Sequence, residues 1–152
     1  MKTLDGSAPL RELLDRLDRV TPDSERQWGV MTPHQMVCHL NDSFKVAMGE
    51  RTAKPRSSWM MRTIGKRIAL YAPMRWPTNI ETIPEVDQKV GGTRPLDFWR
   101  DRDSLSRTMT RFVAAEPDFT WSRHPLFGRM SPRDWKRWGY LHMDHHLRQF
   151  SA

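Results

Sequence analysis

The sequence predicts an all-α protein, a four-helix bundle with a smaller helix inserted into it. Several long segments carry apolar residues three and four positions apart, which is the period of a helix with one buried face. Two of these segments open with a Thr-Pro or Ser-Pro pair, which is typical of an N-cap followed by the first helical position. No stretch alternates apolar and polar residues as a half-buried strand would. Packing the apolar faces against one another favours a bundle.

Four principal helices are expected over residues 8–20, 32–49, 95–115 and 131–150. The first has leucines and a valine at helical spacing and is followed by a Thr-Pro break. The second ends at a glycine, and the third ends at a Glu-Pro-Asp sequence. The apolar stripe of the third consists of Leu96, Trp99, Leu105, Met109, Phe112 and Val113. Together these helices predict a single domain over residues 1–152.

The part of the chain between the second and third principal helices is the least regular. Residues 51–75 contain seven basic side chains and no acidic one. Within them, residues 58–72 have the pattern of an amphipathic helix. One side of it carries Met60, Met61, Ile64, Ile68 and Tyr71. Residues 73–94 follow as a long irregular connection rich in proline and glycine, a length typical of functional loops such as lids.

Composition bounds the classes of protein that the chain can belong to. Its 152 residues are long enough to bury a core, to which seven tryptophans and ten methionines contribute. The net charge of +7 is compatible with an anionic partner, although basic residues spread along the chain are also typical of a solvated surface. A single cysteine excludes an internal disulfide. With no apolar run of signal or transmembrane length, a cytoplasmic location is expected.

Three of the six histidines fall on faces that are predicted to point inward. His142 and His146 lie one turn apart on the last helix, and His39 lies on the apolar face of the second. Three imidazoles arranged in this way can hold a metal ion and leave positions open for water or substrate. The alternatives are a hydrogen-bonded core histidine and a polar helix face at a partner interface. Ser43 and Gln149, one turn beyond ligands, either orient those ligands or line a cavity as ordinary polar residues.

The remaining histidines and the cysteine are assigned other roles. His145 lies at the edge of the inward face, where it could replace His146 or orient substrate, although surface exposure is the simplest interpretation. His124 precedes a proline, which favours a turn or cap role over contact with substrate. His34 is expected to point outward. Cys38 is expected to be inert, because its sequence neighbourhood lacks the cations that activate a thiol.

The spacing around the histidines argues against a zincin-type protease. That motif requires a glutamate directly after the first histidine, where this chain has Met143. The inverted motif requires a glutamate before the last histidine, where this chain has His145. The inward faces show no evident carboxylate base. The nucleophile would therefore be water, or the thiol of a cosubstrate, activated by the metal.

Two segments carry a resemblance that extends over essentially the whole chain. WGVMTPHQMVCHLNDSF (28–44) and HPLFGRMSPRDWKRWGYLHMDHHLRQF (124–150) resemble the DinB/YfiT-like superfamily, in a branch of unknown function. The intervening RWPTNIETIP (75–84) also fits that branch. The resemblance implies an up-down-down-up four-helix bundle that often forms homodimers.

The resemblance also implies a three-histidine metal site. Carried over by position, its ligands are His39, His142 and His146. These imidazoles would accept zinc, nickel, iron(II) or manganese. Some relatives of this kind use a low-molecular-weight thiol as cosubstrate, whereas others resemble hydrolases.

Three functions therefore remain open. The first is a metal-dependent enzyme that catalyses hydrolysis or thiol transfer on a small molecule, with the basic residues 51–75 attracting an anionic substrate. The second is a non-catalytic module that binds a small molecule or dimerises through the same bundle. The third is a nucleic-acid or membrane-surface binder that uses residues 51–75. It ranks last, because no nucleic-acid-reading motif is visible.

Overall fold

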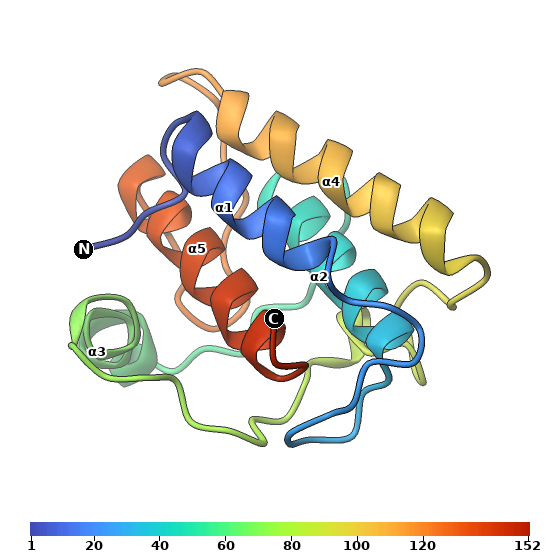
Figure 1. Ribbon diagram of the computed structural model, residues 1–152. Coiled ribbons are helices and arrows are strands. Elements are labelled where there is room, and N and C mark those ends of the chain that lie inside the picture. Colours follow the sequence, from blue (N-terminus) through green and yellow to red (C-terminus); the bar gives the residue numbers. More distant parts are fainter.

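The computed structural model describes residues 1–152 and contains five α-helices and no strands (Figure 1). The helices are α1 (Ser7–Leu17), α2 (Pro33–Ala47), α3 (Lys66–Tyr71), α4 (Phe98–Ala114) and α5 (Pro132–Arg148). A π-helical segment, Met61–Gly65, runs directly into α3, and a short 3₁₀ helix spans Pro84–Val86. The prediction of an all-α fold is confirmed. None of the helices is both long enough and apolar enough to cross a membrane.

The helices that carry the inward histidines start where the sequence predicts. The Thr32 hydroxyl accepts a hydrogen bond from the Gln35 backbone N–H at 3.1 Å, and the Gln35 side chain accepts one from the Thr32 N–H at 2.9 Å. Ser131 and Asp134 form the same reciprocal pair at the start of α5. Each capping box satisfies two N–H groups that a helix end leaves open. These caps also set which side chains of α2 and α5 point inward.

The start of α4 differs from the prediction. The helix begins at Phe98 rather than at residue 95, because the Asp97 side chain caps it by accepting from the Arg100 N–H at 3.0 Å. Leu96 therefore lies outside the helix and is 90% exposed, and Trp99 is half exposed. The buried stripe of α4 consists of the residues that follow, centred on Leu105, Met109 and Phe112.

The four long helices share one apolar core. Helix α2 packs along α4, while α5 contacts both α1 and α2. The core is a single cluster of 21 buried apolar residues, most of which belong to these four helices. Because α4 covers the outer side of α2, Cys38 and Asn41 are buried there. The pattern of apolar residues along α2 does not predict the burial of these two residues.

Helix α3 stands beside α5 and away from the other long helices (Figure 1). Leu70 is its one buried residue. Arg137 of α5, which the helical pattern places on an outer face, is buried and donates to the Leu70 carbonyl at 2.8 Å and to the Lys2 carbonyl. The Tyr71 hydroxyl donates to the Asp134 carboxylate at 2.5 Å. The amphipathic pattern predicts a helix here correctly, but its apolar stripe faces solvent.

Gly139 is expected to be required where α5 crosses the core. A Cβ at this position would lie 2.9 Å from the Phe112 ring and 3.2 Å from the Phe44 ring. Gly139→Ala should therefore lower the free energy of unfolding by roughly 1–3 kcal/mol, even though alanine is the better helix former. Urea denaturation measures this loss. Combining the change with Phe112→Leu should recover part of it, and a Gly139→Ala protein of undiminished stability would contradict the close approach.

Candidate functional site

Three histidines from two helices converge at the centre of the molecule. The nearest ring nitrogens of His39, His142 and His146 all lie within 4.8 Å of one another. The Nε2 atoms of His39 and His142 are 3.1 Å apart. All three residues are buried, with exposed fractions of 5–9%. The structure thus brings together the three histidines that the helix faces and the resemblance select.

The tautomer of His39 is set by a backbone carbonyl. Its Nδ1 lies 2.9 Å from the Val86 oxygen, which can only accept a hydrogen bond. The proton is therefore on Nδ1, and Nε2 presents a lone pair to the centre of the histidine group. Val86 belongs to the 73–94 connection, so this connection is part of the site.

The tautomer of His146 is set in a similar way by Gln149. The Gln149 amide nitrogen donates to the Trp28 carbonyl at 2.8 Å, which turns the amide oxygen toward His146. That oxygen lies 3.1 Å from Nδ1 of His146 and accepts a hydrogen bond from the Nδ1–H group. Gly29 makes the arrangement fit, because it has a φ of +77° and a Cβ there would lie 2.6 Å from the Gln149 amide. Nε2 of His146 is left as the free lone pair.

His142 has a polar atom that the protein does not satisfy. Its Nε2 faces His39, and its Nδ1 is buried without a hydrogen-bond partner. A proton on Nε2 would be donated to His39 but would leave Nδ1 as an unpaired acceptor. A proton on Nδ1 would leave two lone pairs facing each other at Nε2. Buried groups of this kind are uncommon in native structures, and a ligand-binding role is one explanation for them.

Burial keeps the imidazoles of this group neutral. It lowers the pKa of His39, and it lowers the pKa values of His142 and His146 well below their ordinary range. Repulsion between the neighbouring rings adds to the shift for His142 and His146. Neutral imidazole is the form that ligates a metal ion, so the group could hold one at neutral pH.

A fully buried carboxylate holds the 73–94 connection against α2. One oxygen of Asp42 accepts from the Thr93 backbone N–H at 2.7 Å, and the other accepts from the Thr93 hydroxyl at 2.7 Å and from Arg51 at 3.2 Å. Gln88 adds a longer hydrogen bond at 3.4 Å. Asp42 lies three residues after His39, so α2 supplies both the histidine and the anchor of the segment that orients it.

The edge position of His145 suggests exposure at the surface, but the structure shows that this residue is not exposed. It is buried, with its ring centroid 5.9 Å from that of Trp28, 6.0 Å from that of Trp76 and 5.2 Å from that of His146. Its Nδ1 has no hydrogen-bond partner, and burial lowers the pKa of this histidine. The two tryptophans come from loops whose position the last helix does not reveal. His145 therefore forms part of the wall beside the three-histidine group.

His124 has the role of a turn residue. Its Nδ1 accepts hydrogen bonds from the backbone N–H groups of Leu126 and Phe127, both at 3.1 Å. The ring stacks on Phe127 at a centroid distance of 4.5 Å and contacts Trp135 and Trp138. Although the residue as a whole keeps some exposed area, this aromatic environment lowers the pKa of its imidazole to about 3.

Ser43 of α2 is buried one turn beyond His39. The residues that orient the histidines are instead Gln149, which the sequence offers as a candidate, and Val86, which it does not. Val86 contributes a backbone carbonyl, and any residue type can do this. Asp42 was detectable in principle, as a carboxylate on the buried helix that carries His39.

A second group of potential ligands lies between α2 and α4. His34 Nε2 and Cys38 Sγ lie 2.7 Å and 3.6 Å from the same oxygen of Asp101, which also accepts from the Leu96 N–H. His34 is part-buried rather than fully outward. Burial and the Asp101 carboxylate raise the pKa of the Cys38 thiol to about 12, so it stays protonated. His34, Cys38 and Asp101 thus already bind one another without an ion.

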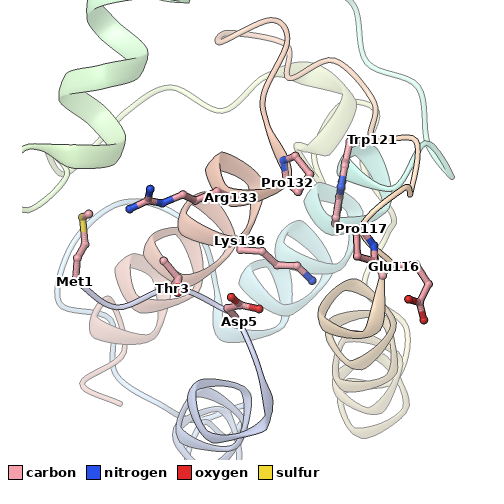
Figure 2. Close-up of a pocket in the computed structure, with 10 residues that line it drawn as sticks. Met1, Thr3, Asp5, Glu116, Pro117, Trp121, Pro132, Arg133 and Lys136 are labelled. Atoms are coloured by element: carbon pink, nitrogen blue, oxygen red, sulfur yellow. The ribbon is translucent and has the colours of Figure 1, made fainter.

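A surface hollow of about 580 Å³ lies at the other end of α5 (Figure 2). It is lined by the N-terminal segment, by the end of α4 and by the first turn of α5. Lys136 borders it, but its ammonium group donates to the Phe112 and Val113 carbonyls at 2.6 and 2.8 Å. These bonds satisfy carbonyls at the C-terminal end of α4. The hollow therefore has a structural lysine at its base and is separate from the histidines.

The fold and the site together define an all-α protein whose buried histidine group could hold a metal ion. The chain belongs to the family described as protein of unknown function (DUF1569), whose model matches residues 5–152. No curated protein and no solved structure matched the chain.

The low pKa of His124 predicts sensitivity to acid. The unfolded chain takes up a proton near pH 6.5, whereas the folded protein does so only near pH 3. The stability that this histidine contributes is therefore fully present above pH 6.5 and is lost as the pH falls toward 3. His124→Asn, which keeps an acceptor near Nδ1 but does not titrate, should reduce the loss between pH 7.5 and 5.5 by about 1 kcal/mol.

Urea denaturation at the two pH values measures the difference between the variant and the wild-type protein. The comparison is internal, because the variant differs from the wild-type protein only at this histidine. An equal loss in both would contradict the assignment of His124 as a buried neutral acceptor.

Proposed function

We propose that His39, His142 and His146 hold a divalent metal ion and that the protein is a metal-dependent enzyme of the DinB/YfiT-like superfamily. The observation that carries the proposal is the convergence of their nitrogens in a buried, neutral group. For His39 and His146, the opposite ring nitrogen donates to a protein acceptor, so Nε2 is the nitrogen presented to the centre. This pattern is typical of histidines that ligate metals.

The resemblance also implies a particular order and direction of the helices. We propose that α1, α2, α4 and α5 form the up-down-down-up bundle of that superfamily as a single domain, with α3 as its insertion. The shared core of these four helices supports this assignment. The motifs MTPxQMxxHL and HxxHH fall on α2 and α5, which carry the histidine group.

The residues present fit a divalent metal ion. Three imidazoles suit zinc, nickel, iron(II) and manganese, and no thiolate is present to narrow the choice. When bound, the ion would lower the pKa of a water molecule or a thiol and so supply a nucleophile for hydrolysis or thiol transfer. The absence of a carboxylate from the group is consistent with this source of the nucleophile.

We expect the residues around the histidines to contact a bound substrate. Trp28 and Trp76 flank His145, whose buried Nδ1 has no partner within the protein and would contact a small-molecule substrate or cosubstrate. Val86 and Gln149 keep two imidazoles in their binding tautomers throughout a reaction. The aromatic walls limit the access of bulk water, which strengthens electrostatic interactions within the site.

The small exposed fraction of the three histidines supports a second candidate, a non-catalytic module that binds a small molecule or a structural ion. Cobalt(II)-loaded protein distinguishes the two candidates. If a coordination position is open and reachable, titration with a low-molecular-weight thiol should produce a sulfur-to-cobalt charge-transfer band. A spectrum that stays unchanged at saturating thiol supports the non-catalytic module.

Metal content tests the proposal directly. Protein purified without an affinity tag from metal-replete cells should contain about one divalent ion per chain by elemental analysis. His142→Ala should lower the affinity for that ion more than about 100-fold, because it removes a ligand. His34→Ala is the matched control, since it removes a histidine from outside the group and should leave the metal content unchanged. Wild-type protein without metal, or equal losses in both variants, would rule out the site.

Gln149 should contribute to metal affinity without binding the metal. Gln149→Leu removes the acceptor for the His146 Nδ1 proton but keeps a side chain of similar size. The affinity for zinc should fall roughly 10- to 100-fold, as measured by competition with a chromophoric chelator. Gln149→Glu restores the acceptor but loses the donor to the Trp28 carbonyl, so it should recover part of that loss. If both variants bind zinc as tightly as the wild-type protein, Gln149 does not orient His146.

A further inference from the structure

The helical run 59–71 presents an apolar face to solvent. Met60, Ile64 and Ile68 are 64%, 54% and 51% exposed, and they lie at helical spacing on one side. Trp59 and Met61 are also exposed on the same run. We call these five residues the outer face of the run. Large side chains of this kind usually gain about 1.5–3 kcal/mol each from burial, so a contiguous exposed set indicates an interaction surface.

The contacts of the inner side hold the outer face in this orientation. Leu70 is buried against the core, and its carbonyl accepts from Arg137 of α5. The Lys66 ammonium group donates to the Arg129 carbonyl at 3.2 Å and lies 3.6 Å from the Asp134 carboxylate. The Trp76 indole donates to the Ala69 carbonyl at 2.7 Å. The outer face is therefore exposed because the opposite side is fixed to the protein.

The charged side chains of the segment that carries the outer face all have the same sign. Residues 51–75 carry seven basic side chains and no acidic one. Arg62, Arg67 and Arg75 are exposed and form no ion pair within the protein. An exposed apolar face beside unpaired arginines is typical of helices that lie at the surface of an anionic membrane.

We propose that the outer face of residues 59–71 docks onto an anionic lipid surface. Its apolar side chains would enter the boundary between headgroups and acyl chains, and Arg62 and Arg67 would contact lipid phosphates. A second copy of the chain fits less well, because a two-fold contact through this face would bring the two sets of arginines together. Nucleic acid would use the arginines but has no need of Ile64 and Ile68.

Co-sedimentation with phospholipid vesicles tests the proposal. The full chain should bind vesicles of phosphatidylcholine with 30% phosphatidylglycerol (about a third anionic lipid) at least about tenfold more tightly than pure phosphatidylcholine vesicles. Binding should weaken as salt is raised from about 0.05 to 0.5 M, because salt screens the arginines. Replacing both Arg62 and Arg67 by glutamine should lower binding roughly 25-fold, at about fivefold per charge.

Two control pairs of variants test whether vesicle binding depends on this face rather than on exposed apolar or basic residues in general. Ile64→Ser with Ile68→Ser should abolish most vesicle binding. Leu96→Ser with Val90→Ser removes apolar side chains elsewhere that are even more exposed, and it should leave binding unchanged. Arg94→Gln with Arg107→Gln is the charge control, since both arginines are exposed outside this region. Because all the altered side chains are exposed, unchanged thermal unfolding confirms that each variant is folded.

Three outcomes overturn the proposal. The first is equal binding to neutral and anionic vesicles, or no binding to either. The second is that Ile64→Ser with Ile68→Ser converts a dimer to a monomer in sedimentation while vesicle binding is absent, which would make a second copy the occupant. The third is binding of a DNA oligonucleotide that depends on Arg62 and Arg67 but not on Ile64 and Ile68. None of these measurements depends on the metal site.

Discussion

The buried carboxylate of Asp42 is the interaction on which the geometry of the site depends. It lies on α2 and accepts hydrogen bonds from the backbone and hydroxyl of Thr93, which tie the end of the 73–94 connection to that helix. The connection in turn brings the Val86 carbonyl to Nδ1 of His39. A charge in such a place is stable only while its partners are present, so the carboxylate, Arg51 and the connection stabilise one another. The orientation of His39 thus depends on a carboxylate that does not touch it.

The sequence predicts those residues of the site whose direction is determined by their position around a helix. Capping boxes at Thr32 and Ser131 set where α2 and α5 begin, and a residue's angle around a helix then follows from its number. His39, His142 and His146 were identified in this way, because each lies on a long helix with a clear start. The all-α class was equally accessible, since apolar spacing is a local property.

The features of the site that the sequence did not predict depend on which segments pack together. Local sequence patterns do not encode this packing. Val86 contributes a backbone carbonyl, which leaves no mark in the sequence. His145 is buried because loops carrying Trp28 and Trp76 fold over it. The 58–72 pattern predicts a helix but cannot tell whether its apolar side meets a core or solvent. That side is exposed because polar contacts to α5, such as that of Arg137, fix the opposite side.

The unsatisfied nitrogens indicate why a small protein keeps histidines in its centre. Burying Nδ1 of His142 and of His145 without partners costs stability, which an apolar side chain in either place would avoid. Trp135 also buries a lone N–H, but an indole contributes a large apolar surface in return. The imidazoles offer less of that compensation. Departures from good packing that persist in a folded protein are expected at functional sites, where stability is given up for binding. The unpaired histidines therefore favour a ligand-binding role for this centre over a purely structural one.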